Sequence, residues 1–565
     1  MKKLVRIALA SLAATLAWAA PKVSPDMPRA TRNGTVDVIV QYRPGTTGSE
    51  LKQVRSVGVV RRQFRSIPAV HMTVPLSMIA TLAANPRVTY VSPDRITTSL
   101  LDITTQAVFA NQQWTSGWDG TGVGIAVIDS GVALKPDLAT SDGSSWRVVF
   151  SDSFIPNHDA SDEYGHGTHV AGIIGANGAR SSGPGFTHTF KGVAPNANII
   201  NLRVLDENGS GTESEVIAAV DEAIQLKNKY NIRVINLSLG HPVFESFQLD
   251  PLCQAVEAAW KAGITVVAAA GNSGRDNSLG TQGYATIDSP GNDPYVITVG
   301  AMNAKGTPWR SDDVIASYSS KGPTLLDHFV KPDLVAPGNN VVSLLASPDC
   351  TLATEFPSTL ISTATYETSN HGVSTDYFKL SGTSMATPVV SAAVALLLQK
   401  NPALTPDEIK ARLMKTAGKN FPRYSVASEM VGSNTYTSQS DIFTIGAGYL
   451  DLAAAMTNQD LAGFQALSPV AVYHADTNTV SLVSASAVIG STNAVWGDNA
   501  VWGDNAVWGD NAVWGDNAVW GDNAVWGDNA VWGDNAVWGD NAVWGDNAVW
   551  GDNAVWGDVL YNGDK

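Results

Sequence analysis

The chain has 565 residues, more than one ordinary domain holds, so the sequence predicts two or three structural units. Its formal net charge of −16 is uneven: residues 20–100 carry +7, and the chain from Leu101 onward carries −26. So acidic a body argues against nucleic-acid binding. The opposite charges favour attraction between the two parts, although two independent solvated surfaces would have the same charges.

The first nineteen residues have the pattern of a secretory signal. Basic residues precede an apolar run over 7–18, and Ala17-Trp18-Ala19 is a small-x-small cleavage site. The run is too short to span a membrane, and no later run in the sequence is long enough. We therefore expect a secreted, extracellular protein without a transmembrane segment.

Residues 20–100 contain two short runs that are typical of strands, at 36–40 and 69–74. Helical patterns lie between these runs and after them. The segment is therefore expected to form a small α+β unit ahead of the main body of the chain.

From 101 to 456, short β-branched runs alternate with helical patterns. Continuous apolar strands of this kind are typical of a parallel sheet buried on both faces, with helices as crossovers. The predicted fold class is therefore α/β, with three layers around a central, mostly parallel sheet and functional groups at the carboxyl ends of its strands. The expected strands are 123–128, 198–204, 234–239, 264–270 and 295–299, and the expected helices are 213–229 and 252–262.

The last part of the chain is repetitive. A polar linker, 457–492, has one strand-like patch and precedes eleven copies of Asn-Ala-Val-Trp-Gly-Asp at 493–558, which are followed by a short end, 559–565. The repeats are consistent with a stacked β-solenoid and with a disordered low-complexity tail, and both interpretations stay open. Exposed tryptophans would also suit contact with a cell envelope.

The two cysteines, Cys253 and Cys350, fit an exported protein that lacks a disulfide framework. They would form one bridge that closes a long loop, or remain two buried thiols, and the sequence leaves both alternatives open. Their surroundings do not have the spacing of a zinc site.

An acid and a histidine lie where a catalytic pair is expected. Asp129 ends a buried strand, and a carboxylate there can hold an imidazole in the required tautomer, although an Asp that starts a turn is the simpler alternative. His166 begins a helical pattern and can face a cleft. His169, one turn later, is expected to pack or to form a hydrogen bond. The two histidines do not indicate zinc, because no Glu lies between them.

A serine and an asparagine could complete such a site. Ser384 lies between a Gly-Thr turn and a long apolar helix, where unpaired backbone N–H groups stabilise an anion, although the same pattern is typical of a helix cap. Asn272 follows another apolar strand, and its amide could donate to an oxyanion together with the backbone N–H of Ser384. A simple Gly-Asn turn is the alternative there.

Four motifs together resemble the four signatures of the subtilisin family, in the family's order. The resemblance covers roughly residues 36–456, and four motifs in register are far more specific than any one of them. The motifs are Asp129-Ser130-Gly131, His166-Gly167-Thr168-His169-Val170-Ala171-Gly172, Ala270-Gly271-Asn272 and Gly382-Thr383-Ser384-Met385-Ala386.

The resemblance implies a role for each site residue. Asp129 orients the base, His166 is general base and then acid, and Ser384 attacks the peptide carbonyl. Asn272 completes the oxyanion hole. An extended polypeptide would pair with backbone on both sides of the cleft, and the uncharged wall 268–270 would favour apolar or large neutral residues before the cut. The residues implied around the substrate are Ser238, Leu239, Gly240, Leu205, Gly209, Gly211 and Ala270.

Residues 20–100 are similar to the family's inhibitory propeptide. This similarity implies a self-processed zymogen, in which the propeptide inhibits its own chain until it is cut off near Leu100. An apolar leucine before the cut agrees with an uncharged pocket wall.

Catalysis is expected to need no cofactor, whereas the family implies structural calcium. Asp137 resembles one of the family's calcium ligands, but residues 177–190 lack the usual calcium-loop residues, so the sequence does not place the ion. Residues 347–376 form an insertion before the nucleophile motif.

The predicted function is therefore that of a secreted serine endopeptidase with polypeptide substrates. The competing class is an adhesive protein, in which an inactive scaffold presents the tryptophan repeats. The presence of all four site residues favours the enzyme. A processing enzyme of narrow specificity would need acidic residues in the pocket, and the wall motifs contain none.

Overall fold

The computed structural model describes most of residues 22–485, together with 554–557 and 564. Within the first range it leaves out 24–26, 28–33, 44, 46–47, 64–67, 94–99, 279, 370–371, 420–425, 432–433, 464 and 475–478. The chain divides into two compact units, Met1–Thr97 and Thr98–Lys565. The predicted signal and residues 493–553 of the repeats lie outside the described residues.

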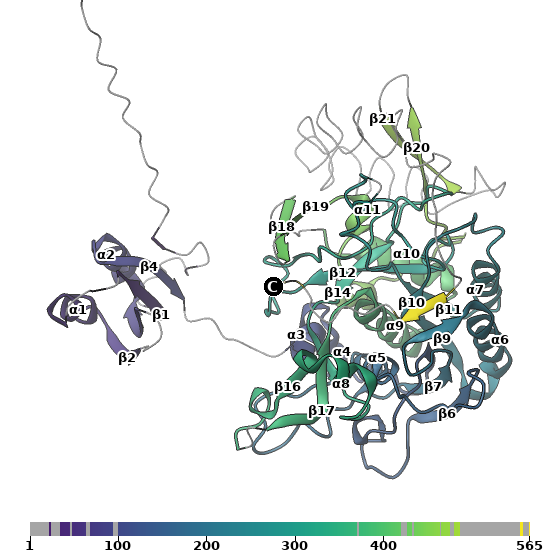
Figure 1. Cartoon of the computed structure of the whole chain (residues 1–565), viewed down its shortest axis with the longest axis horizontal. Coiled ribbons are helices and arrows are strands. Elements are labelled where there is room, and N and C mark those ends of the chain that lie inside the picture. Colours follow the sequence, from purple (N-terminus) through teal and green to yellow (C-terminus); the bar gives the residue numbers. More distant parts are fainter. Residues whose placement is uncertain are drawn as a thin grey trace, which may run out of the picture. The chain divides into compact units, whose positions relative to one another are not determined.

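The first unit contains a four-stranded antiparallel sheet with two short helices (Figure 1). In the strand Thr35–Tyr42, alternate side chains are buried, so one face of the sheet packs against the core of this unit. The strands expected at 36–40 and 69–74 correspond to β1 and β3. The elements are β1 Thr35–Tyr42, α1 Gly48–Arg55, β2 Val59–Gln63, β3 Ala69–Pro75, α2 Ile79–Ala84 and β4 Val88–Pro93, in the sheet order β2-β3-β1-β4.

The second unit is built on an eight-stranded sheet in which all pairs but one are parallel. The predicted α/β class and the mostly parallel sheet are therefore confirmed. The sheet order is β13-β12-β11-β9-β5-β7-β6, and β14 also pairs with β12. The strands are β5 Gly124–Asp129, β6 Val148–Ser153, β7 Asn198–Arg203, β9 Ile232–Leu237, β11 Thr265–Ala269, β12 Ile297–Asn303, β13 Val314–Ile315 and β14 Leu334–Pro337.

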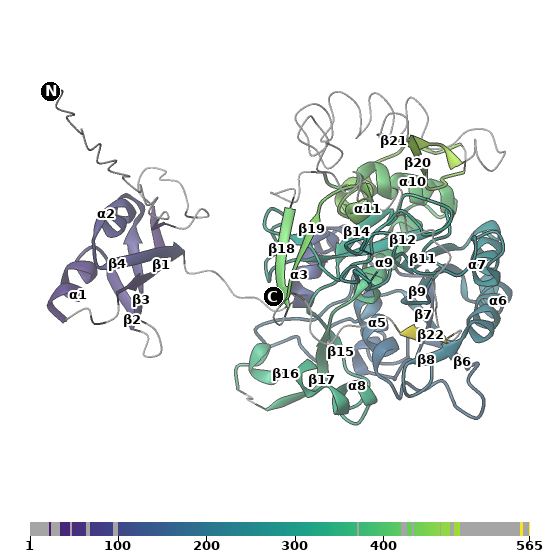
Figure 2. The same cartoon turned by 45° about the horizontal axis from the view of Figure 1, so that its top comes forward.

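Helices cover both faces of this sheet (Figures 1 and 2). α5 (His166–Gly175) packs against α9 (Thr383–Lys400), while α6 (Glu213–Tyr230) packs against α7 (Pro251–Lys261). Because helices lie on both sides, every side chain of β5 and β11 is buried, as their uninterrupted apolar sequences predict. α9 is apolar on all sides and buried along nearly its whole length, so it forms the centre of the unit.

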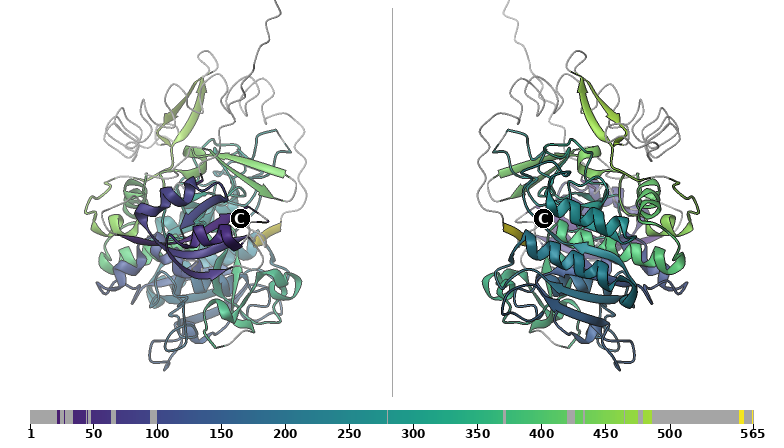
Figure 3. Two further views of the ribbon diagram at one scale, coloured as in Figure 1. Left: turned by 90° about the vertical axis from the view of Figure 1, so that its left-hand side faces the viewer. Right: turned by 90° about the vertical axis from the view of Figure 1, so that its right-hand side faces the viewer.

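Shorter elements surround this core. Two hairpins, β18–β19 and β20–β21, lie at the surface (Figure 3). None of the described helices is long and apolar enough to cross a membrane. The remaining elements are α3 Leu100–Ala107, α4 Ala110–Trp114, β8 Ser210–Thr212, β10 Leu239–Gly240, β15 Val341–Leu344, α8 Thr351–Glu355, β16 Leu360–Ser362, β17 Val373–Leu380, α10 Pro406–Thr416, β18 Val426–Val431, β19 Asn434–Gln439, α11 Ile442–Ile445, α12 Leu452–Thr457, β20 Val470–His474, β21 Thr479–Val483 and β22 Ala554–Gly557.

The two cysteines are free and buried. Cys253 lies on α7, where its thiol contacts Asn292, whereas the Cys350 thiol lies against Gly165. The structure therefore favours two buried thiols over a bridge. The predicted cleavage point, Leu100, is the first residue of α3, and cleavage there stays a prediction.

A buried charge cluster joins the sheet to α10. The carboxylate of Asp333, at the start of β14, contacts Lys331 Nζ at 2.8 Å and Lys410 Nζ at 3.2 Å, and all three side chains are fully buried. Ser468 Oγ donates a further hydrogen bond to the same carboxylate. Two buried lysine side chains thus share direct contact with the carboxylate of Asp333.

We expect Asp333→Asn to destabilise the second unit by about 3–5 kcal/mol, because it removes the carboxylate that contacts two buried lysine side chains. The urea midpoint of unfolding measures this loss. Asp460→Asn is the matched control, since it breaks an exposed ion pair with Lys415 and should leave the midpoint almost unchanged. Equal midpoints for both variants would contradict a structural role for the cluster.

Candidate active site

Three predicted site residues lie at one edge of the central sheet. Asp129 is the last residue of β5, Ser238 directly follows β9, and Asn272 lies shortly after β11. These strands are neighbours and parallel, so their carboxyl ends meet at the same edge. This edge is where the sequence places functional groups.

Asp129 and His166 form a buried hydrogen-bonded pair. His166 Nδ1 lies 2.7 Å from Asp129 Oδ1, and both side chains are fully buried. The same carboxylate oxygen accepts a hydrogen bond from the backbone N–H of Ser130 at 2.8 Å. A Cβ on Gly167 would come 3.1 Å from this oxygen and 2.2 Å from the carbonyl oxygen of Gly131, so only glycine lets the start of α5 approach so closely. The carboxylate therefore fixes the orientation of the imidazole.

A second buried carboxylate, that of Asp162, supports this pair. It accepts hydrogen bonds from Ser130 Oγ at 2.8 Å, from the Gly165 N–H at 2.7 Å and from the Thr168 N–H at 2.8 Å. Burial raises the pKa of this carboxyl above its ordinary value, against the hydrogen bonds it accepts. Asp162 thus connects the turn after β5 to the first turn of α5. The sequence motifs gave no sign of it, because it lies outside them.

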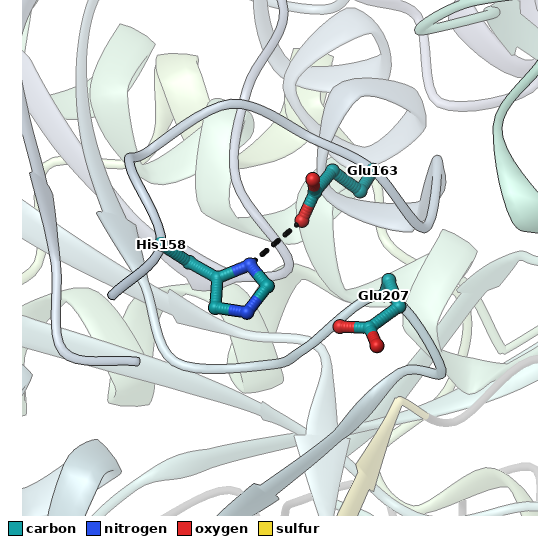
Figure 4. A group of neighbouring side chains, drawn as sticks. All are labelled: His158, Glu163 and Glu207. Atoms are coloured by element: carbon teal, nitrogen blue, oxygen red, sulfur yellow. Dashed lines mark hydrogen bonds and ion pairs between the residues drawn. The ribbon is translucent and has the colours of Figure 1, made fainter. Parts of the chain in front are cut away.

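Arg203 holds the loop that leads into His166. Its buried guanidinium donates to the carbonyl oxygens of Asp159 and Ser161 and to Glu163 Oε2 at 2.7 Å. Figure 4 shows Glu163 beside His158 and Glu207, with a 3.0 Å contact between His158 and Glu163. A metal ion among these three exposed side chains would face the guanidinium of Arg203, so we interpret the group as an ion-paired anchor of the loop.

Ser384 is the second residue of α9. Its hydroxyl donates to the carbonyl oxygen of Ser238 at 3.0 Å, and Ser238 Oγ donates to the Ser384 carbonyl oxygen at 2.9 Å. A helix would normally satisfy that carbonyl with the N–H four residues later, but this position is Pro388, which has none. Ser238 supplies the missing donor and thereby ties β9 to the start of α9.

Asn272 is bonded to the same helix start. Its Oδ1 accepts from the Thr383 N–H at 3.0 Å, and Thr383 Oγ1 accepts from the Gly271 N–H at 3.1 Å. The other end of the amide, Nδ2, is buried and has no hydrogen-bond partner among the described residues. An unpaired buried donor costs about 1–3 kcal/mol, which a ligand oxygen at this place would recover.

Three of the predicted substrate residues lie in two short strands. Leu239 and Gly240 make up β10, and Gly211 lies in β8. A Cβ on Gly211 would come 2.0 Å from the carbonyl oxygen of Val204, and one on Gly209 would come 2.5 Å from the ring of Tyr164. Both positions therefore require glycine, because a larger residue would collide with Val204 or Tyr164. Leu205 is buried beside Gly211, and Ala270, the residue directly after β11, is also buried.

One carboxylate near this region, that of Asp288, is not marked by any motif in the sequence. A Cβ on Gly271 would come 2.3 Å from Asp288 Oδ2, and a Cβ on Gly240 would come 3.2 Å from Asp288 Cβ. Asp288 thus lies between the wall 268–271 and the strand β10, and its N–H donates to the Ala270 carbonyl. It belongs to an irregular segment without a motif, so only the contacts reveal its place.

The surroundings of Asp137 do not fit calcium. Its carboxylate accepts hydrogen bonds from Tyr377 Oη at 2.6 Å and from the Arg180 N–H at 3.3 Å. The neighbouring carbonyl oxygens of Asp137, Ala139, Gly175 and Ala197 all accept from the buried guanidinium of Arg147. The positive charge that these oxygens face is therefore that of an arginine.

Comparison with known proteins agrees with this arrangement. Residues 120–448 match the model of the subtilase family of peptidases, and the chain belongs to that family. It is similar to the serine protease AprX of Bacillus subtilis (37% identical over 402 residues, covering 68% of this chain and 83% of that protein). Subtilisin E of the same organism is 34% identical over 366 residues, covering 64% of this chain and 78% of subtilisin E.

A third relative is an extracellular serine proteinase from a Thermus strain, which is 34% identical over 375 residues and covers 64% of this chain and 74% of that protein. Family membership establishes the chain as a serine protease, a hydrolase that acts on polypeptides. The matched range contains all four residues proposed for catalysis.

The pKa of Asp137 provides a test of its surroundings. Burial raises it from 3.8 to about 6, so the native protein binds an extra proton in that pH window and loses stability as the pH rises through it. We expect the melting temperature of Asp137→Asn, measured relative to that of the wild type, to rise between pH 4 and 7, with or without EDTA.

Asp142→Asn is the control, because that exposed carboxyl has a pKa lowered to about 2 by hydrogen bonds from Thr140 and Ser144 and does not titrate in this window. If added calcium raised the melting temperature of the wild type but not that of Asp137→Asn, Asp137 would be a calcium ligand after all.

Proposed function

We propose that the protein is a secreted serine endopeptidase that cleaves peptide bonds through Asp129, His166 and Ser384. The observation that carries this proposal is the buried Asp129–His166 pair at the sheet edge where Ser384 and the unpaired Asn272 Nδ2 also lie. An inactive scaffold would not need a buried amide donor without a partner.

The proposed reaction has two stages. Ser384 Oγ bonds to the peptide carbonyl carbon while its proton passes to His166 Nε2, the nitrogen that does not contact Asp129. Asn272 Nδ2 and the backbone N–H of Ser384 stabilise the oxyanion. The C–N bond then breaks, and the leaving amine takes the proton from His166. Water hydrolyses the acyl-enzyme by the same steps, which restores Ser384.

Two finer parts of the proposal rest on the sequence. The pattern of residues 1–19 supports secretion, and the Thermus relative is named as extracellular. Residues 20–100 are proposed as an inhibitory propeptide, which is consistent with a separate compact unit before Thr98. If the protein binds structural calcium, we propose that the ion binds away from Asp137.

The roles of Ser384 and Asn272 are separable by kinetics. We expect Ser384→Ala to lower kcat on an unfolded protein substrate by about 10⁶-fold. Asn272→Leu should lower kcat by about 10²–10³-fold with little change in KM, because its donor acts on the transition state. Mass spectrometry of the same samples should show an uncut precursor for Ser384→Ala and, for the wild type, a mature chain that starts between Ile96 and Leu101. Undiminished hydrolysis by Ser384→Ala would refute the mechanism.

The position of Asp288 indicates a different substrate preference from the apolar one expected from the uncharged wall 268–270. We propose that its carboxylate favours lysine or arginine before the cut, since a charge-assisted hydrogen bond contributes about 1.5–3 kcal/mol. Asp288→Asn should therefore lower kcat/KM for a peptide with lysine there by about 10- to 100-fold. A matched peptide with phenylalanine should be cleaved as before.

An unchanged ratio between the two peptides would favour the uncharged wall as the determinant. The mature N-terminus bears on the same question. A start at Leu101 fits an apolar pocket, whereas a start at Ile96, directly after Arg95, fits a pocket that contains Asp288.

A further inference from the structure

A strand from the far end of the same chain lies between the two strands that contain predicted substrate residues. β22, Ala554–Gly557, lies between β8 and β10 and pairs with both in antiparallel orientation. Figure 2 shows it as the yellow strand beside β8. Trp556 pairs with Gly240 on one side and with Ser210 on the other, and Gly557 pairs with Leu239. β22 belongs to the last copy of the hexapeptide repeat.

The register of β22 directs it toward Ser384. Because β22 is antiparallel to β10, its carboxyl end, Gly557, lies opposite Leu239. Ser238 directly precedes Leu239, and its carbonyl oxygen accepts a hydrogen bond from the Ser384 hydroxyl. An extended peptide with this pairing approaches the serine as a substrate would, from the amino-terminal side of the cut.

A second contact anchors the chain end. The Asp564 carboxylate, which is almost fully buried, forms an ion pair with Arg275 at 2.6 Å and accepts hydrogen bonds from the Ser317 N–H and Oγ. Its carbonyl oxygen accepts from the side-chain amides of Asn339 and Asn340, and its N–H donates to Asn339 Oδ1. Three charge-assisted hydrogen bonds to one buried carboxylate make this a specific binding site for the chain end.

Two partners of Asp564 belong to segments that also reach the proposed active site. Arg275 follows Asn272 by three residues. Asn339 follows Gly338, whose carbonyl oxygen accepts from the N–H of Gly382 at the start of α9. The chain end therefore pairs with β8 and β10 through β22 and, through Asp564, contacts segments that directly follow Asn272 and Gly338.

We propose that the cleft binds the chain's own C-terminal repeat as an intramolecular ligand that competes with polypeptide substrate. This inference rests on the proposed function in one respect, namely that substrate occupies the same cleft. Backbone pairing does not select side chains strongly, so any of the eleven identical copies can offer the same Ala-Val-Trp-Gly segment. Asp564 favours the last copy, and the covalent link gives the ligand a high effective concentration.

The composition of the repeat explains why it would stay intact. None of the eleven copies contains lysine or arginine. If Asp288 selects a basic residue before the cut, the repeat binds through its backbone without presenting a preferred cleavage site. The ligand then acts as an inhibitor rather than as a substrate.

Direct binding of the chain end tests the proposal without relying on activity. The probe is a fluorescent peptide with the sequence of residues 553–565. The protein is the self-processed chain with Asn272→Leu, which slows hydrolysis, and Asp564→Ala, so that residues 20–100 have been cut off and the peptide alone carries the Asp564 anchor. Fluorescence anisotropy should show saturable binding of this peptide. Peptides with Asp564→Ala or Trp556→Pro should bind at least about tenfold more weakly, because the first lacks the ion pair and the second lacks a backbone N–H donor. A peptide with Asn553→Ala is the matched control and should bind unchanged.

Kinetics of the full chain give a second measurement. On a short chromogenic peptide, Asp564→Ala should lower the apparent KM several-fold at unchanged kcat, because the internal competitor is weakened. Asp349→Ala removes an exposed carboxylate elsewhere and should change neither constant.

The proposal is overturned if the peptide of residues 553–565 binds no better than a scrambled one, or if Asp564→Ala leaves KM unchanged. Failure of the proposed function is a separate outcome. Hydrolysis that survives Ser384→Ala would refute the catalytic mechanism, while the anisotropy would still decide whether the cleft binds the chain end.

Discussion

The parallel alignment of β5, β9 and β11 is the constraint on which the rest of the site depends. Parallel neighbours present their carboxyl ends at one edge, so residues far apart in the sequence meet without any special loop. Asp129, Ser238 and Asn272 arrive there from three consecutive strands of the sheet. The start of α9 then closes the arrangement through Thr383 and Ser384, which are bonded to two of these strand ends.

Buried polar groups keep this edge rigid. Asp162 and Arg203 bind the loop before α5 through its backbone, so the imidazole of His166 is held from two directions. Each of these charges is buried and satisfied by several partners, which makes the loop sensitive to the loss of either one. Asp129 orients the imidazole by direct contact, and Asp162 and Arg203 add to this by holding the loop that leads into His166.

Much of the fold and of the candidate site could be predicted from the sequence, because apolar strands and short motifs are local patterns. The runs 123–128, 198–204 and 264–270 correspond to β5, β7 and β11, and the four motifs contain Asp129, His166, Asn272 and Ser384. Asp162, Asp288 and the partners of Asp137 could not be predicted, because their roles arise from contacts across distant, irregular segments. β22 could not be predicted either, since eleven identical repeats do not specify which copy pairs.

The reciprocal hydrogen bonds between Ser238 and Ser384 have an evolutionary consequence. Pro388 leaves the Ser384 carbonyl without its helical donor, and the Ser238 hydroxyl replaces it. The two positions are therefore energetically coupled. A relative that has lost the hydroxyl at position 238 is expected to have also lost the proline at 388, so that covariation between these two positions would record the contact.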